Sequence, residues 1–312
     1  MATIWVTGAH GFIGRHLAKS LAADGVSVCG IGHGHWPKSE AQQWGIHTWV
    51  NGSVEAANLS LLSASSSVPD TVFHLAGGSS VGAASTNPSE DFRRTVVSTS
   101  ELLEWLRLNA RQARIVAVSS AAVYGANYEN PITETAETAP CSVYGSHKLM
   151  MEDLCRYYSS HYGLHVVLPR LFSVYGCGLK KQLLWDLCEK LASGESVELS
   201  GSGDELRDWI EVRDVVRGLQ RVVSIASDEA PCVNLATGQG TSVREVSLMV
   251  SKFWSARNEA PAVSFSRRIR PGDPFSLVAD VHRLQQLQLK LEITPSEGIE
   301  AYIKWYQNLA TS

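Results

Sequence analysis

Two residues in the sequence are spaced to move a proton together. Tyr144 and Lys148 form the only Tyr-x-x-x-Lys in a chain with nine tyrosines. On a helix, side chains four positions apart share a face, so the phenol and the ammonium would be neighbours. A free phenol has a pKa of about 10, and a nearby cation stabilises the phenolate. We expect an acid–base tyrosine whose pKa Lys148 lowers, the alternative being a surface contact.

A serine at the end of an apolar run could assist such a tyrosine. Ser120 ends the stretch "RIVAVSS", which predicts a buried strand, and Ala121 and Ala122 follow it. A serine hydroxyl can give and accept a hydrogen bond, whereas the two alanines have no proton to give or take. The turn therefore offers one hydroxyl and no second acid or base.

Three glycines near the N-terminus could hold a dinucleotide. Gly8, Gly11 and Gly14 stand in "GAHGFIG", between a strand-like run and a helix-like run. Glycines at such a place allow a tight turn and a close approach of the backbone to a pyrophosphate, which then faces the helix N-terminus. This context favours dinucleotide binding over a purely structural turn.

The elements that must position these residues alternate along the first half of the chain. The expected strands are residues 3–8, 26–32, 47–50, 71–77, 114–120 and 165–172, and the helices include 14–24, 93–110 and 144–163. Such alternation indicates an α/β fold, a doubly wound parallel sheet with helices on both faces. Residues 60–67, "SLLSASSS", are interpreted as a solvated surface turn.

Composition excludes several classes of protein. The chain has 312 residues, 44% of them hydrophobic and 19% charged, with a net charge of −4 and no basic stripe. No apolar run reaches the roughly 18–20 residues of a membrane span, so we expect no nucleic-acid or membrane partner. No signal-peptide pattern precedes the first strand, which predicts a cytoplasmic protein. The six cysteines lack metal-ligand or disulfide-framework spacing, so no metal is expected.

Motifs along the chain resemble the extended short-chain dehydrogenase/reductases that modify nucleotide sugars. The resemblance runs from residue 3 to about 308 and rests on the glycine motif, "HLAG", "SSAAVYG", Tyr144/Lys148, "PRLFSVYG", "RDWIEVRDVV", "VNLATG" and "RPGDP". It implies a Rossmann NAD(P)-binding domain of residues 1–169, with 209–238 and 275–284. It also implies a smaller, partly interleaved lobe of residues 170–208, 239–274 and 285–312 that binds a nucleotide-diphosphate sugar. Relatives pair the helices near 93–108 and 148–158, so a homodimer is expected.

The resemblance also assigns roles to individual residues. Tyr144 would be the acid–base, Ser120 would bond the same substrate oxygen, and Lys148 would hold the nicotinamide ribose. The cofactor would further contact Gly8, His10, Gly11, Phe12, Ile13, Gly14, Gly32, His33, Ser53, Val54, Leu75, Ala76, Gly77 and Leu171. The substrate would contact Ser79, Ser120, Ala121, Ser173, Arg207 and Arg270, the two arginines suiting a diphosphate. Trp209 and Asp214 are expected to be structural.

Ala121 and Ala122 narrow the reaction within this family. The 4,6-dehydratases carry an acid–base pair after the serine or threonine, and the epimerase-reductases carry a cysteine in this turn. Neither is present, so hydride transfer at one sugar carbon remains, either reduction of a keto sugar or epimerisation at C4. An unusual base elsewhere in the chain is the remaining alternative.

Other departures bear on the cofactor. Gly32, followed by His33, stands where an NAD enzyme of the family has a carboxylate for the adenosine ribose. Ser53, Thr95 and Ser173 also replace frequent polar residues. We therefore expect NADP(H), with NAD as the alternative. The leading interpretation is an NADP(H)-dependent nucleotide-sugar 4-ketoreductase of polysaccharide biosynthesis. The alternatives are an NAD-dependent C4 epimerase and a non-catalytic NADP-binding regulator.

Overall fold

The chain folds into two compact units. The computed structural model describes residues 2–126, 128–129, 131–194, 196–255, 263–268 and 274–309. The first unit contains residues 1–125, 136–171 and 216–234, and the second contains 126–135, 172–215 and 235–312. Both units are therefore discontinuous in sequence. The assignment of a cofactor lobe and a nucleotide-sugar lobe to these units stays a prediction.

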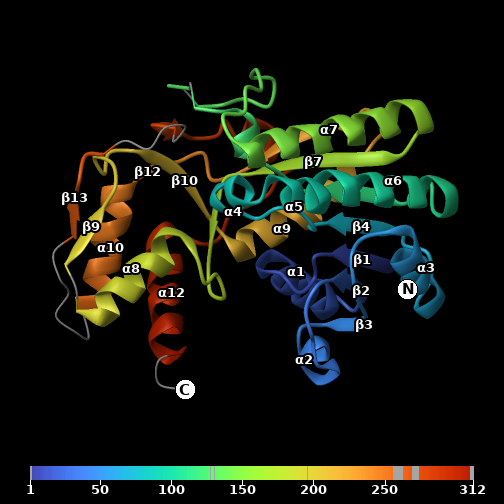
Figure 1. Cartoon of the computed structure of the whole chain (residues 1–312), viewed down its shortest axis with the longest axis horizontal. Helices are drawn as coiled ribbons and strands as arrows, with labels where there is room; N and C mark the ends of the chain where they lie inside the picture. Colours follow the sequence, from blue (N-terminus) through green and yellow to red (C-terminus); the bar gives the residue numbers. More distant parts are fainter. Residues whose placement is uncertain are drawn as a thin grey trace. The chain divides into compact units, whose positions relative to one another are not determined.

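A parallel sheet forms the centre of the first unit (Figure 1). Its strand order is β11-β7-β5-β4-β1-β2-β3, with β6 paired to β7. The strands are β1 Thr3–Thr7, β2 Ser27–Gly32, β3 Ile46–Asn51, β4 Thr71–His74, β5 Arg114–Ala117, β6 Ser119–Ser120, β7 His165–Leu171 and β11 Cys232–Leu235. The chain moves outward from β1 to β3 and then returns to place β4 on the other side of β1. This reversal confirms the doubly wound fold, in which ligands bind at the strand ends near the reversal.

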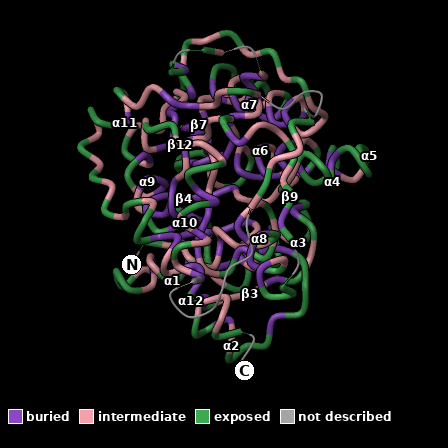
Figure 2. Tube along the Cα trace, turned by 90° about the vertical axis from the view of Figure 1, so that its left-hand side faces the viewer, coloured by how far each residue is buried: buried purple, intermediate pink, exposed green. Residues whose placement is uncertain are grey.

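Amphipathic helices cover the sheet because their apolar faces need burial. The helices of this unit are α1 Phe12–Ala23, α2 Lys38–Gln43, α3 Ala56–Ser65, α4 Val81–Thr86, α5 Pro88–Phe92, α6 Ser98–Asn109 and α7 Val143–Tyr162, and α9 Val212–Val222 enters it. Trp105 of α6 packs on Trp5 of β1 with ring centroids 5.0 Å apart, and its indole donates to Ser60 at 3.0 Å. In Figure 2 the buried part of the trace runs through the strands β4 and β7.

The segment between α5 and α6 is a single π-helical turn, Arg93–Val97. It contains Thr95, which is fully buried and accepts a hydrogen bond from the Gly78 amide at 2.8 Å. Such turns insert one residue into a helix and often occur at functional sites. Here the turn brings a hydroxyl to the loop that follows β4.

One local prediction is wrong. Residues 60–67 were expected to form a solvated turn, but α3 continues to Ser65. Leu59 and Leu62 are fully buried in the core that α3 shares with the sheet. Their spacing of three residues places both on one helical face, and that burial outweighs the weak helix propensity of the serines.

The second unit is built on short strands and isolated helices. It contains β8 Ser173–Tyr175, β9 Val197–Leu199, β10 Leu206–Glu211, β12 Gly240–Ser242, β13 Val263–Phe265 and β14 Ser276–Leu277. Its helices are α8 Gln182–Ser193, α10 Val243–Ser255, α11 His282–Gln286 and α12 Pro295–Leu309. β10 is central, with β8 and β14 parallel to it and β12 antiparallel.

Buried carboxylates hold the loops of this unit. Asp208 accepts hydrogen bonds from the amides of Thr237 and Gly238, at 2.7 and 2.8 Å. Asp214 accepts the amides of Glu292 and Ile293, and the Trp209 indole donates to the Thr241 carbonyl at 3.3 Å. These contacts fit the structural roles expected for Trp209 and Asp214.

Two negative findings concern the described residues. Among them, no helix has the length and apolarity needed to cross a membrane. The same part of the chain contains no group of three or more histidine, cysteine or acidic side chains that could hold a metal ion. The six cysteines, all of which belong to the described residues, form no disulfide with one another.

Candidate active site

The glycine-rich loop connects β1 to α1 in a tight turn. Gly8 has φ of +70°, a conformation that favours glycine, and its carbonyl accepts the Gly11 amide at 2.9 Å. A Cβ on Gly14 would overlap with the Gly8 carbonyl, and one on Gly8 would lie 2.9 Å from the Ala76 amide nitrogen. Each glycine therefore permits a close approach of backbone segments. No acidic residue lies in the first turn of α1, so its N-terminus can accept an anion.

Tyr144 lies in the first turn of α7. Ser142 caps this helix by accepting the Gly145 amide at 3.1 Å. A Cβ on Gly145 would lie 2.5 Å from the Ala122 carbonyl oxygen, so a glycine there lets α7 approach the turn after β6. This close approach brings Tyr144 within hydrogen-bond reach of Ser120. Two residues predicted from separate motifs thus meet at the end of one strand.

The environment of Tyr144 favours the neutral phenol in the chain alone. Burial raises the pKa of Tyr144, a hydrogen bond with Ser120 lowers it, and the Asp91 carboxylate raises it. We expected Lys148 to lower this pKa, but burial dominates and Lys148 is not among the causes of the shift. Ser120 therefore supports the phenolate here, and its hydroxyl also accepts the Ala122 amide at 3.2 Å.

Lys148 is buried one helical turn after Tyr144. Its ammonium donates to the Val118 carbonyl at 3.0 Å, and a Cβ on Gly77 would lie 3.1 Å from Nζ. Burial lowers the pKa of Lys148 to about 8, although the carboxylates of Asp91 and Glu152 raise it. The ammonium is thus held between the end of β5 and the loop after β4.

A buried ion-pair network, which the sequence reasoning missed, supports the strand end that carries Ser120. Glu152, on α7, accepts a hydrogen bond from Ser119 at 2.6 Å and two from Arg170, at 2.8 and 2.7 Å. Arg156 adds a further contact to Glu152 at 2.7 Å. Burial raises the pKa of Glu152, but Arg170, Ser119 and Arg156 outweigh it and hold the pKa below its usual value. The only local signal was a glutamate four residues after Lys148.

Aromatic and cationic groups surround Gly32 at the end of β2. His10 stacks on Trp36 with centroids 4.6 Å apart and lies 3.2 Å from the His33 carbonyl oxygen. The Arg15 guanidinium lies 5.3 Å from the Trp36 ring centre, and a Cβ on Gly32 would be 3.2 Å from the Trp49 ring. Among the described residues, the buried indole nitrogens of Trp36 and Trp49 have no hydrogen-bond partner. We call the five side chains His10, Arg15, His33, Trp36 and Trp49 the β2 cluster.

The other expected contact residues lie at several strand ends. Leu75, Ala76 and Gly77 follow β4, where the Ala76 amide donates to Thr7 at 3.1 Å. Val54 and Leu171 are buried, whereas Ser53 and Ser79 are exposed. Ala121 is buried in the turn after β6.

The remaining predicted substrate contacts lie in the second unit or beyond the described residues. Ser173 begins β8, and Arg207 of β10 donates to the Leu206 carbonyl at 2.8 Å. Arg270 lies outside the described residues. The roles of all three as substrate contacts therefore remain predictions.

Comparison with known proteins agrees with this arrangement. Residues 4–236 match the family model described as the NAD dependent epimerase/dehydratase family. A putative UDP-glucose 4-epimerase of Methanocaldococcus jannaschii is 27% identical over 98% of this chain and 98% of its own length. UDP-glucose 4-epimerase 4 of Oryza sativa subsp. japonica is 30% identical over 90% of this chain and 84% of its own.

Solved structures show the same fold over nearly the whole chain. MoeE5 in complex with UDP-glucuronic acid and NAD has a TM-score of 0.87 and 31% identity, covering 99% of this chain and 100% of MoeE5. The UDP-glucose 4-epimerase of Thermus thermophilus in complex with NAD has a TM-score of 0.86 and 26% identity, covering 98% and 99%. The chain therefore belongs to the NAD dependent epimerase/dehydratase family, within the extended short-chain dehydrogenase/reductases, and is an NAD(P)-dependent enzyme of the nucleotide-sugar group, a reductase or an epimerase.

Proposed function

We propose that this protein is an NAD-dependent nucleotide-sugar C4 epimerase that acts on a UDP-sugar. One observation carries the proposal: Tyr144 lies beside Ser120, and Ala121 and Ala122 add no second acid or base in that turn. An epimerase needs one such group, since the proton removed from the hydroxyl returns to the same oxygen. The named relatives support this choice over the ketoreductase that the sequence placed first.

Each residue of the reaction centre would have a defined task. Tyr144 would take the proton of the C4 hydroxyl and return it after the sugar carbon has been inverted. Ser120 would hydrogen-bond the same oxygen, and Lys148 would place its positive charge by the cofactor ribose. When bound, the nicotinamide would supply reversible hydride transfer at C4. The glycine loop fits a pyrophosphate, because a Cβ at Gly8 or Gly14 would close the turn.

The expected lobes follow from these tasks. Residues 1–169, with 209–238 and 275–284, would hold the cofactor, including the contacts predicted at Phe12, Ile13 and Val54. Residues 170–208, 239–274 and 285–312 would hold the nucleotide sugar, through Ser173, Arg207 and Arg270. Guanidinium groups suit a diphosphate because their planar fork makes paired hydrogen bonds.

A second candidate, the NADP(H)-dependent 4-ketoreductase, is favoured by the β2 cluster. No carboxylate stands at the end of β2, where Gly32 and His33 are found, and the histidines and Arg15 of the cluster would tolerate a 2′-phosphate. A third candidate, a non-catalytic NADP-binding regulator, would have no use for Tyr144 and Lys148 beside Ser120. The Ser120 contact to Tyr144 therefore ranks it last.

Product analysis separates the three candidates. The purified protein is incubated with UDP-glucose or UDP-glucuronic acid, with and without added NAD, and the products are followed by NMR. An epimerase forms the C4 epimer with no net change in reduced nicotinamide. Consumption of NADPH by a UDP-4-keto sugar, without epimer, would instead establish the ketoreductase. The absence of turnover with either type of substrate would favour the non-catalytic NADP-binding regulator.

We also propose that the protein is a homodimer. The exposed apolar residues include Val97, just before α6, and Met150 and Tyr157 on α7. Exposed apolar side chains gathered on neighbouring helices are typical of an interface. Sedimentation at micromolar concentration should give twice the chain mass, and Met150→Lys should shift the protein toward monomer. A monomer in the wild type would contradict the proposal.

A further inference from the structure

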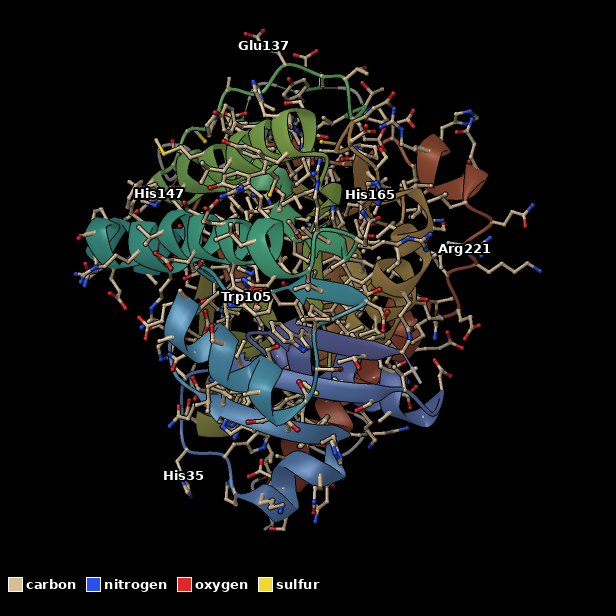
Figure 3. The ribbon with its side chains drawn as sticks, turned by 90° about the vertical axis from the view of Figure 1, so that its right-hand side faces the viewer. His35, Trp105, Glu137, His147, His165 and Arg221 are labelled. Atoms are coloured by element: carbon tan, nitrogen blue, oxygen red, sulfur yellow. The ribbon has the colours of Figure 1, made fainter. Side chains whose placement is uncertain are left out.

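A buried acidic residue lies beside the reaction centre without a role in the proposed reaction. Asp91, at the end of α5, has its Oδ2 atom 2.6 Å from Nδ1 of His147 on α7, and both residues are buried. An ionised carboxylate only accepts hydrogen bonds, so Nδ1–H of His147 is the donor. Phe92 packs edge-on against the imidazole at 5.4 Å. His147, labelled in Figure 3, is a residue of α7 and lies between Tyr144 and Lys148 in the sequence of that helix.

Asp91 also contacts the loop that Lys148 approaches. A Cβ on Gly78 would overlap with Oδ1 of Asp91, so Gly78 is a glycine because the carboxylate occupies that space. The neighbouring Gly77 is the residue that the Lys148 ammonium approaches. Thr95, one helical turn after Asp91, fixes this loop by accepting the Gly78 amide. The carboxylate and the ammonium therefore approach adjacent residues of a single loop.

The charges around Lys148 single out Asp91. The titratable groups that face Lys148 are His74, Asp91, Glu152 and Cys155. Burial, with Lys148, lowers the pKa of His74 to about 3, and burial, with Glu152, raises the pKa of Cys155 to about 12, so both are neutral near pH 7.

The two remaining groups are carboxylates with different partners. Two arginines, Arg170 and Arg156, each lie 2.7 Å from the carboxylate of Glu152 and offset its negative charge. Asp91 faces a histidine instead. The charged residues next to it in sequence pair with one another: Glu90 of α5, which is partly exposed, lies 2.7 Å from Arg94 and 3.9 Å from Arg93, two exposed residues of the following π-helical turn.

We propose that Asp91, held in place by His147, is a positioning residue that supplies the buried negative charge opposite Lys148. The proposal rests on the proposed roles of Tyr144 and Lys148. Asp91 raises the pKa of both groups. Asp91 therefore favours a charged Lys148 ammonium and a protonated Tyr144 phenol. Both groups consequently titrate at a higher pH than they would without the Asp91 charge.

The first test removes the charge and keeps the shape. In Asp91→Asn the amide oxygen can still accept the Nδ1–H of His147, so the pair is preserved without its charge. Both the acid and the alkaline limbs of the kcat profile should move to lower pH. A residue with a purely structural role would lower kcat and leave both limbs in place, which would overturn the proposal.

A second readout does not depend on the substrate. In protein labelled with ¹³C at Cζ of tyrosine, the Tyr144 resonance is assigned by its loss in Tyr144→Phe and is titrated without ligand. Asp91→Asn should lower the midpoint of this titration. If the proposed reaction is wrong but this inference is right, the midpoint still moves. An unchanged midpoint overturns the inference whatever the reaction is.

His147 provides the test of which partner bears the charge. His147→Asn keeps an N–H donor near the position of Nδ1 and is always neutral, so the tyrosine midpoint should remain at the wild-type value. An upward shift would mean that a charged imidazole cancels Asp91 in the wild type, which contradicts the proposal. The matched control is Asp153→Asn, which removes an exposed charge from the same helix and should leave the midpoint unchanged.

A double variant that removes the Asp91 charge and fills the space it leaves addresses the risk that a single variant misfolds. Asp91→Ala with Gly78→Ala removes the carboxylate and places a methyl group where its oxygen lay, so the double variant should fold and show the same downward shift as Asp91→Asn. Gly78→Ala alone should be destabilised, because its methyl collides with Asp91. A double variant that folds and titrates like the wild type would overturn the proposal.

Discussion

The reaction centre and the β2 cluster lie in the same unit but are held in different ways. Around Tyr144 and Lys148, the buried charges of Asp91, Glu152 and Arg170 all have partners at hydrogen-bond distance. Around Gly32, the contacts are mainly between rings, and the cation of Arg15 is partly exposed and 3.6 Å from Glu40. Hydrogen bonds fix direction, whereas ring contacts tolerate sliding and substitution. We therefore expect substitutions around Tyr144 and Lys148 to be poorly tolerated, whereas substitutions in the β2 cluster can change which cofactor is preferred.

The largest expected effect comes from removing the phenol. Tyr144→Phe should lower turnover by roughly 10²- to 10⁴-fold, because the phenol that we propose as the acid–base group at the substrate oxygen is lost. Affinity for the cofactor, measured by fluorescence titration, should change little. The matched control is Tyr157→Phe, an exposed tyrosine of the same helix. Near-normal turnover in Tyr144→Phe would remove Tyr144 from the mechanism, and the difference between the reaction centre and the β2 cluster would then have no functional meaning.

The second effect tests how firmly the reaction centre is built. Glu152→Ala leaves the Arg170 guanidinium buried without its carboxylate, which should cost about 3–5 kcal/mol of the free energy of unfolding. Glu104→Ala breaks a partly exposed pair with Arg107 and should cost at most about 1 kcal/mol. Urea denaturation of both variants measures the difference. Equal costs would show that the centre is no more tightly held than the surface.

The third effect concerns the charge on Lys148. Because burial lowers the pKa of Lys148 to about 8, the ammonium is present below that pH and is lost above it. Turnover should therefore fall by about tenfold per pH unit above this point. In Lys148→Arg the side chain stays charged, so this alkaline limb should disappear even if turnover is lower. A limb that persists in the arginine variant belongs to another group.

Most of the scaffold could be predicted from sequence because its signals are local. The strand at 71–74, the loop of Gly8 to Gly14 and the Tyr144–Lys148 spacing all involve residues within a few positions of one another. Asp91 and His147 were missed because 56 residues separate them, and Glu152 and Arg170 because 18 do. Such pairs form only when the sheet brings separate helices and strands together. The pKa of Tyr144 was expected to fall for a related reason, since spacing reveals the nearby cation but not the burial.

The smallest effect tests the β2 cluster itself. A Cβ on Gly32 would lie 3.2 Å from the Trp49 ring and 3.5 Å from the Gly8 Cα, so an added carboxylate extends toward the glycine loop if Trp49 yields by a few tenths of an ångström. Gly32→Asp offers an acceptor to the ribose hydroxyls of NAD and repels a 2′-phosphate. Relative affinity should move toward NADH by about 1–3 kcal/mol, the value of one charged hydrogen bond, as measured by titrating NADH and NADPH. Gly32→Asn has the same size without the charge, so an equal shift in that control would reduce the effect to sterics. If the wild type binds NADPH more tightly than NADH, the ketoreductase assignment is strengthened. If it binds NADH more tightly, the result fits the epimerase, and the β2 cluster has a role only in packing.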